Sequence, residues 1–249
     1  MAKSLVFGNW KMHGSRQFCD ELVAGLVAGL ERTAAGVAVF PTALHLERVA
    51  GQLSRAGIAT GAQNFYPAEQ GAFTGEVSAP MLRDIGVSHV LVGHSERREI
   101  FAESNEIVAG KFIAAQQYGL TPVLCVGESL AEREAGETES RVASQLNAVL
   151  ELAGVQAFGS AVIAYEPVWA IGTGKTATPE QAQDVHQFIR GHLARLDEGV
   201  AADVSILYGG SVKSSNAGEL FAQPDINGGL VGGASLVADE FISICKSAE

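Results

Sequence analysis

The sequence predicts one α/β domain over residues 1–249, folded as a closed eight-stranded parallel barrel with helices outside. Eight short apolar runs recur along the chain, and amphipathic helical patterns lie between most of them. Strands that alternate with helices form right-handed βαβ units and a parallel sheet. Eight such units in 249 residues is the number that closes a (β/α)8 barrel. An open doubly wound sheet is the competing architecture.

The expected elements follow in order along the chain. The strand candidates share the short, mostly apolar composition of strands that are buried on both faces. They begin near Leu5, Val37, Ile58, His89, Pro122, Ala161, Val204 and Gly229. The helical patterns cover residues 17–30, 44–55, 81–85, 105–118, 139–152, 179–196, 216–221 and 236–244. Thr178 before Pro179 is typical of a helix start, with a capping hydroxyl followed by proline in the first turn.

Composition and charge narrow the class of protein. The chain is 47% hydrophobic, which is enough to bury a large core, and no linker-like segment divides it. Its net charge of −11 argues against a nucleic acid or an anionic membrane as partner. A small anionic substrate remains compatible, because a few cationic groups in a cleft can dominate the local potential.

The cysteines and the apolar runs indicate in which cellular compartment the protein is expected. Cys19, Cys125 and Cys245 are odd in number, far apart and without metal-ligand spacing, so neither a disulfide framework nor a metal site is expected. No apolar run approaches the length of a membrane span. We therefore expect a soluble, cytoplasmic protein.

Polar residues gather just after the expected strands. In a parallel barrel the active site forms at the carboxyl ends of the strands, so chemistry is expected at these positions. The residues are Asn9, Lys11, Gln63, Asn64, His94, Glu96, Cys125, Glu128, Glu166, Gly209, Gly210, Ser211, Gly232 and Gly233. Glycines after the last two strands let backbone N–H groups face an anion, which favours a phosphate site there.

The segment 161–177, AVIAYEPVWAIGTGKTA, carries the sharpest hypothesis. Its apolar run ends where Glu166 leaves the barrel, and Pro167 fixes the direction of the chain. Gly172 and Gly174 then allow the following loop to bend. This pattern favours a catalytic base attached to a hinged lid, and the alternative is a surface glutamate on an ordinary loop.

Three other motif interpretations fail on spacing. His94 and Glu96 match half of a zinc deaminase signature, but the Pro-Cys-x-x-Cys part is missing. A P-loop would need glycine where Trp169 stands. The glycines from Gly172 come too late after the strand for a dinucleotide fingerprint. Taken singly, Lys11 could be a solvated surface lysine and His94 a structural histidine.

The combined motifs are more specific than any one of them, and by them the chain resembles the triosephosphate isomerase family. The resemblance runs from the first strand to the last helix. It is carried by Gly8-Asn9-Trp10-Lys11, Gly93-His94-Ser95-Glu96-Arg97-Arg98, Ala164 to Lys175, Tyr208-Gly209-Gly210-Ser211 and Leu230-Val231-Gly232-Gly233-Ala234. His13 and Phe40 depart from the family pattern, and both lie outside the chemistry.

The resemblance implies a role for each site residue. Glu166 would be the proton-shuttling base, His94 the electrophile, Lys11 a cation near the substrate oxygens and Asn9 a polar contact. Glu96 and Cys125 would support them. We also expect Ser95 to cap a helix directly after His94, which would help to keep the imidazole neutral.

The resemblance also implies the reaction and the assembly. Glyceraldehyde 3-phosphate and dihydroxyacetone phosphate would interconvert through an enediol(ate), without cofactor or metal, in glycolysis and gluconeogenesis. Gly172, Ser211, Gly232 and Gly233 would bind the phosphate through backbone N–H groups. The long loop from Gln63 to Ser78 would dock into a second subunit and form a homodimer.

Two alternatives on the same barrel stay open. Another phosphosugar isomerase would have a different acid/base pair and would lack the intact lid around Trp169. A barrel that only binds phosphates or proteins would have lost Glu166, His94 or Lys11, and all three are present.

Overall fold

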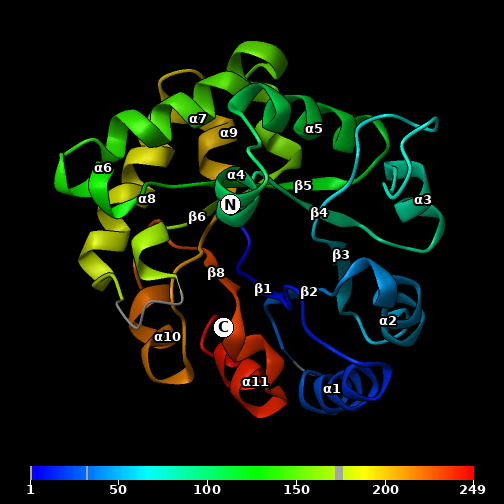
Figure 1. Ribbon diagram of the computed structural model, residues 1–249. Helices are drawn as coiled ribbons and strands as arrows, with labels where there is room; N and C mark the ends of the chain where they lie inside the picture. Colours follow the sequence, from blue (N-terminus) through cyan, green and yellow to red (C-terminus); the bar gives the residue numbers. More distant parts are fainter. Residues whose placement is uncertain (1, 32, 172–175) are drawn as a thin grey trace.

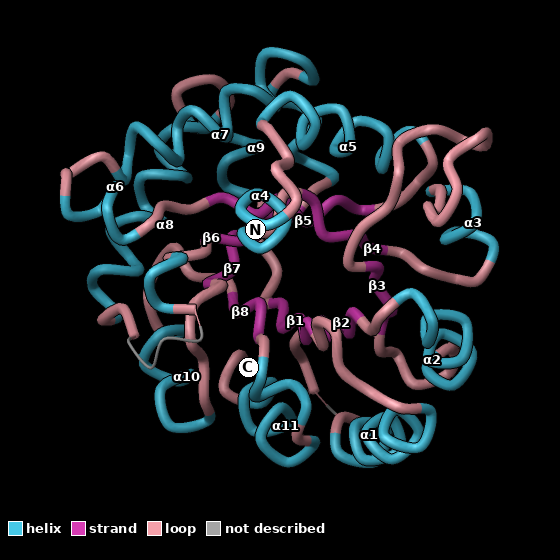
Figure 2. Tube along the Cα trace, in the orientation of Figure 1, coloured by secondary structure: helices cyan, strands magenta, loops and turns pink. Residues whose placement is uncertain are grey.

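The computed structural model describes residues 2–31, 33–171 and 176–249. The described strands form one closed parallel barrel in chain order, and helices surround it (Figures 1 and 2). The strands are β1 (Leu5–Asn9), β2 (Gly36–Phe40), β3 (Ala59–Ala62), β4 (His89–Val92), β5 (Thr121–Val126), β6 (Val162–Tyr165), β7 (Ser205–Tyr208) and β8 (Gly228–Val231). Every strand starts within one residue of its predicted start, and the closed barrel excludes the open sheet.

The helices lie outside the barrel (Figure 2). The α-helices are α1 (Arg16–Gly29), α2 (Leu46–Leu53), α3 (Ala79–Asp84), α4 (Ser95–Ile100), α5 (Asn105–Gln117), α6 (Leu130–Glu134), α7 (Thr138–Ala153), α8 (Pro179–Ala194), α9 (Glu198–Asp203), α10 (Ser214–Phe221) and α11 (Ala238–Lys246). Short 3-10 helices are η1 (Ala43–His45), η2 (Val155–Ser160), η3 (Val168–Ala170) and η4 (Gly233–Leu236). Thr178 caps α8 as expected, accepting the N–H of Gln181. The sequence pattern missed α6 and α9, which are only one or two turns long, whereas α4 is the helix expected directly after His94.

The barrel closes where the first strand meets the last. Leu5 pairs with Gly228 and Val6 with Gly229 in parallel register. Gly228 has a φ of 117°, and a Cβ there would lie 2.0 Å from the carbonyl oxygen of Leu5. This position therefore requires glycine, since any side chain would push β8 away from β1.

Two apolar cores hold the fold. One fills the barrel interior with alternate strand residues, among them Phe7, Phe40, Leu91 and Leu207. The other, larger core lies where the strands pack against the surrounding helices. Because the strands are parallel, the chain segments that follow them all emerge at the same mouth of the barrel.

Candidate active site

The mouth of the barrel holds a cavity of about 450 Å³. Seven of the predicted site residues line it: Asn9, Lys11, His94, Glu166, Ser211, Gly232 and Gly233. Glu96 reaches the group through its ion pair with Lys11. Gly172, the remaining predicted residue, lies outside the described residues.

Glu166 stands directly after β6 and is almost fully buried, with 2% of its surface exposed. Its backbone N–H donates to the carbonyl of Val126 at 2.7 Å, so the β5–β6 ladder continues past the strand end. The Ser95 N–H donates to Oε2 at 2.8 Å. The His94 Nε2 atom lies 3.0 Å from Oε1. The carboxylate is thus fixed by the barrel on one side and by the start of α4 on the other.

His94 is the N-cap of α4, and Ser95 is the first residue of the helix. Our expectation that Ser95 would cap the helix was therefore wrong. The Glu96 N–H donates to the imidazole Nδ1 at 3.2 Å, which leaves the Ser95 N–H free to bind Glu166. A nitrogen that accepts an N–H cannot itself carry a proton, so this geometry describes a neutral imidazole with its hydrogen on Nε2.

The two buried groups shift each other's pKa. Burial raises the pKa of the Glu166 carboxyl, but His94 and the Ser95 N–H outweigh it and keep that pKa below the usual value. Burial lowers the pKa of His94, whereas the Glu166 carboxylate raises it, with a net upward direction. The bond from the Glu96 N–H to Nδ1 acts against protonation, and we take the imidazole as neutral. The surroundings of Glu166 therefore favour its ionised form.

Lys11 follows β1 in a strained backbone conformation, with a φ of 48°. Residues other than glycine rarely adopt such angles, so the surroundings must hold them there. Asn9 Oδ1 accepts the Lys11 N–H at 3.0 Å, and Gln63 Nε2 donates to the Lys11 carbonyl at 2.8 Å. The ammonium pairs with Glu96 Oε1. Strain and pairing together direct the lysine into the mouth.

Asn9 completes the polar wall of the cavity. Its Nδ2 atom lies 3.3 Å from His94 Nε2, while its Oδ1 is occupied by the Lys11 N–H. Because Nε2 carries the histidine hydrogen and faces Glu166 Oε1 at 3.0 Å, the two nitrogens are both donors that lie side by side. A substrate oxygen placed between them would accept from both.

Another part of the cavity lining is glycine-rich backbone. Ser211 follows β7, and Gly232 is the N-cap of η4 with the unusual pair φ −85°, ψ −111°. Both the N–H and the hydroxyl of Ser235 donate to the Gly232 carbonyl, at 2.8 and 2.7 Å. The carbonyl is thus occupied by Ser235, and the first N–H groups of a helix have no partner within the helix.

Cys125 lies beside the base but has no nucleophilic character. It is fully buried, and burial together with the Glu166 carboxylate raises the pKa of its thiol well above the usual value. Among the described residues, no group of three histidine, cysteine or acidic side chains could hold a metal ion. None of the described helices is long and apolar enough to span a membrane.

The sequence pattern placed Glu128 after a strand but gave it no role. The fully buried Oε1 of this residue accepts the Tyr165 hydroxyl at 3.1 Å and the Trp169 indole N–H at 2.9 Å. Arg133 donates to the same oxygen at 3.1 Å. Glu128 thus ties η3, which follows Glu166 and Pro167, to the barrel. The sequence alone could not predict this contact, because Trp169 is 41 residues away from Glu128 and only the fold brings the two together.

The fold and the site define the class of protein: a (β/α)8-barrel enzyme whose mouth joins a buried carboxylate, a neutral imidazole and a lysine. The family model described as triosephosphate isomerase matches residues 4–248. The chain belongs to the triosephosphate isomerase family.

Curated relatives agree with this family over the whole chain. A triosephosphate isomerase of Thiobacillus denitrificans is 60% identical over 249 residues, which cover 100% of this chain and 99% of the relative. One of Stenotrophomonas maltophilia strain K279a is 57% identical over 248 residues, with the same coverage. One of Pseudomonas entomophila is 57% identical over 249 residues, again with that coverage.

Proposed function

We propose that this chain interconverts D-glyceraldehyde 3-phosphate and dihydroxyacetone phosphate, as the name of its family states. One observation carries the assignment of roles. The carboxyl group of Glu166 is buried, and its Oε1 lies 3.0 Å from Nε2 of His94. A base and a hydrogen-bond donor in this arrangement suit the removal of a proton next to a carbonyl group.

The reaction needs one base that serves two adjacent carbons. Glu166 takes a proton from C1 of dihydroxyacetone phosphate, and the electron pair moves onto the C2 carbonyl oxygen to form an enediolate. The proton on O1 passes to O2, the same carboxyl returns a proton to C2, and C1 becomes the aldehyde while C2 carries the hydroxyl. Atoms and electrons balance without an external oxidant or reductant.

His94 and Lys11 stabilise the developing negative charge on the substrate oxygens. In the free enzyme Nε2 of His94 faces Glu166, so the substrate oxygen must replace the carboxylate at that nitrogen. Asn9 Nδ2, 3.3 Å from Nε2, supplies a second donor to the same place. Lys11, paired with Glu96, adds the positive charge. These donors are already oriented, so they need little reorganisation when the charge forms.

The phosphate group binds at the glycine-rich wall of the cavity. Ser211, Gly232 and Gly233 supply backbone N–H groups, and the start of η4 adds its partial positive charge. Gly172 of the lid is proposed as a further donor by family resemblance, and it lies outside the described residues.

We further propose a homodimer formed through the loop from Gln63 to Ser78. The loop is compact: the Tyr66 N–H bonds to the Val77 carbonyl at its base, and the rings of Tyr66 and Phe73 lie 4.3 Å apart near its tip. Phe73 is 41% exposed, and Met12 and Leu44, after β1 and β2, are 91% and 92% exposed. Apolar side chains this exposed at one end of the barrel favour burial against a second copy.

Domain organisation and location complete the proposal. We infer one domain, because the barrel needs strands from both ends of the chain. The cytoplasm suits the free, buried thiols of Cys19, Cys125 and Cys245. The net charge of −11 gives no support to a nucleic-acid partner.

A coupled assay with glyceraldehyde 3-phosphate tests the proposal. Glu166→Gln should lower kcat by about 10²- to 10⁴-fold with little change in KM, since a positioned base contributes a factor of that order. Glu219→Gln on the exposed face of α10 is the matched control and should behave as wild type. A Glu166→Gln enzyme within about threefold of wild type would contradict the assignment of the base.

A further inference from the structure

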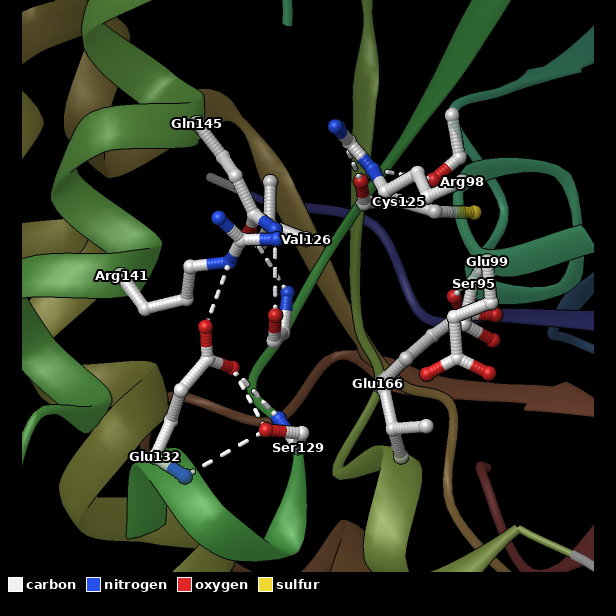
Figure 3. Close-up of a pocket in the computed structure, with 13 residues that line it drawn as sticks. Ser95, Arg98, Glu99, Cys125, Val126, Ser129, Glu132, Arg141, Gln145 and Glu166 are labelled. Carbon is white, nitrogen blue, oxygen red and sulfur yellow. Dashed lines mark hydrogen bonds and ion pairs between the residues drawn. The ribbon is translucent and has the colours of Figure 1, made fainter. Parts of the chain in front are cut away.

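A second cavity, of about 170 Å³, lies behind the catalytic base (Figure 3). It is lined by Ser95, Cys125 and Glu166 on the barrel side and by Gln145 and Arg141 of α7. In Figure 3 Gln145 reaches from the helix toward the chain at Val126, while the Glu166 carboxylate lies on the other side, near Ser95. The cavity therefore separates α7 from the carboxylate itself.

Gln145 makes two hydrogen bonds to one residue. The Gly127 N–H donates to Gln145 Oε1 at 2.8 Å, and Gln145 Nε2 donates to the Gly127 carbonyl at 3.1 Å. Gln145 is only 2% exposed, and it shares the buried side of α7 with Val142, Leu146 and Val149. A polar side chain among apolar neighbours is costly unless it is bonded, so this amide is specifically matched to Gly127.

Gly127 is in turn packed directly on the backbone of the base. A Cβ at this position would lie 1.8 Å from the Glu166 carbonyl oxygen. On either side, the Glu166 N–H bonds to the Val126 carbonyl and the Val168 N–H to the Glu128 carbonyl, at 2.7 and 3.1 Å. A displacement of the Gly127 peptide must therefore move the backbone that carries Glu166.

We infer that Gln145 is a positioning residue for Glu166, acting through the Gly127 peptide. The inference rests on the proposed function, in which Glu166 is the base. Gly127 lies beyond the end of β5, and as a glycine it has no side chain to anchor it. The two hydrogen bonds of the Gln145 amide hold the Gly127 peptide in place, and this peptide packs against the backbone of Glu166.

The decisive experiment replaces Gln145 by methionine, which keeps the length of the side chain and removes both hydrogen bonds. A misplacement of reacting groups by about 1 Å can cost about 10²-fold in rate. We expect kcat of Gln145→Met to fall by about 10- to 100-fold, with KM within about twofold of wild type.

Gln183 of α8 offers a matched control. Its Nε2 donates to Asp225 Oδ2 at 2.6 Å, and its Oε1 accepts the Asp225 N–H at 3.0 Å. This is also a two-way contact with one residue, made to the backbone N–H and the side-chain carboxylate of Asp225 in the loop before β8. Gln183→Met should lower the melting temperature as Gln145→Met does, but its kcat should remain within about twofold of wild type.

Gln145→Glu supplies a readout that does not depend on Gln145→Met folding. The glutamate keeps an oxygen for the Gly127 N–H, but when ionised it directs a second oxygen at the Gly127 carbonyl. When protonated it can donate to that carbonyl and restore the pair. Since burial raises the pKa of a carboxyl group, kcat relative to wild type should rise as the pH is lowered from 8 to 6.

The outcomes separate this inference from the proposed function. A folded Gln145→Met enzyme with wild-type kcat, an equal loss of kcat in Gln183→Met, or a Gln145→Glu ratio that does not change with pH would each overturn the positioning role. A wild-type protein without isomerase activity would overturn the proposed function instead.

Discussion

Nε2 of His94 lies 3.0 Å from Oε1 of Glu166, so the donor and the base are in contact in the free enzyme. A substrate oxygen must part them before either can act. Binding therefore exchanges one hydrogen bond of His94 for another, and the imidazole need not change its protonation state.

This contact predicts unequal costs for the two side chains. His94→Gln should lower kcat less than Glu166→Gln, because Lys11 still faces the same oxygen while nothing replaces the base. Steady-state kinetics of both variants and of the double variant give the comparison. If the two single losses multiply in the double variant, the residues act independently, and a smaller combined loss indicates that they work as a unit.

The proposed dimer depends on the exposed loop tip. Phe73→Asp places a charge where the apolar ring, 41% exposed in the single chain, would enter the partner. Sedimentation should show a shift from dimer to monomer at micromolar concentration, with a large loss of activity. Met81→Gln is the comparison variant, because Met81 is an exposed apolar residue of α3 outside this loop and glutamine adds no charge. A fully active monomer would contradict the assembly proposed here.

Salt dependence tests which electrostatic field the substrate meets. The molecule carries −11 overall, whereas Lys11 and Lys213 line the cavity. We expect the cleft to dominate, so that kcat/KM falls as salt rises and screens the attraction. Lys213→Gln should make that fall shallower. A kcat/KM that rises with salt would mean that the net negative charge governs the approach.

Two histidines outside the site predict acid sensitivity. Burial lowers the pKa of His89 to about 4 and that of His186 to about 3, from a usual value of 6.5. Each group binds its proton more readily in the unfolded chain. Their contribution to the free energy of unfolding is therefore complete above about pH 6.5 and declines as the pH falls toward 4 and 3.

Replacing one of them should flatten this pH dependence. His89 starts β4, and its ring meets Phe7 inside the barrel at 5.3 Å. In His89→Gln the loss of stability between pH 7 and pH 4.5 should shrink by up to about 2 to 3 kcal/mol, as a shift of this size implies. Urea unfolding at a fixed protein concentration measures it. An unchanged pH slope would mean that His89 is not the responsible group.

The strands and the polar positions after them were predictable because both are local properties of the sequence. An apolar run indicated where β6 begins, and Glu166 could be recognised as the polar residue directly after this run. The cap of α4 could not be predicted in this way. His94 caps the helix through its ring nitrogen, whereas side chains such as serine and asparagine are the usual caps.

Long-range contacts set the limit of prediction for the rest of the site. Gln145 matches no motif, and its partner Gly127 is 18 residues away, so only the packing of α7 on β5 joins them. The tie between Glu128 and Trp169 likewise depends on the register of β5 and β6. Positive φ at Lys11 has no signature in sequence, since the Asn9 and Gln63 contacts impose it.

The pairing of Leu5 with Gly228 has a consequence for how the chain is made. Strands that are 223 positions apart in sequence must meet before the barrel can close, so this step cannot occur until nearly the whole chain has left the ribosome. Until then β1 is an open edge with unpaired backbone groups, which is the kind of surface on which chains associate wrongly. The last strand is short and begins with two consecutive glycines, so only Leu230 and Val231 bring side chains that must be ordered as it enters the remaining gap.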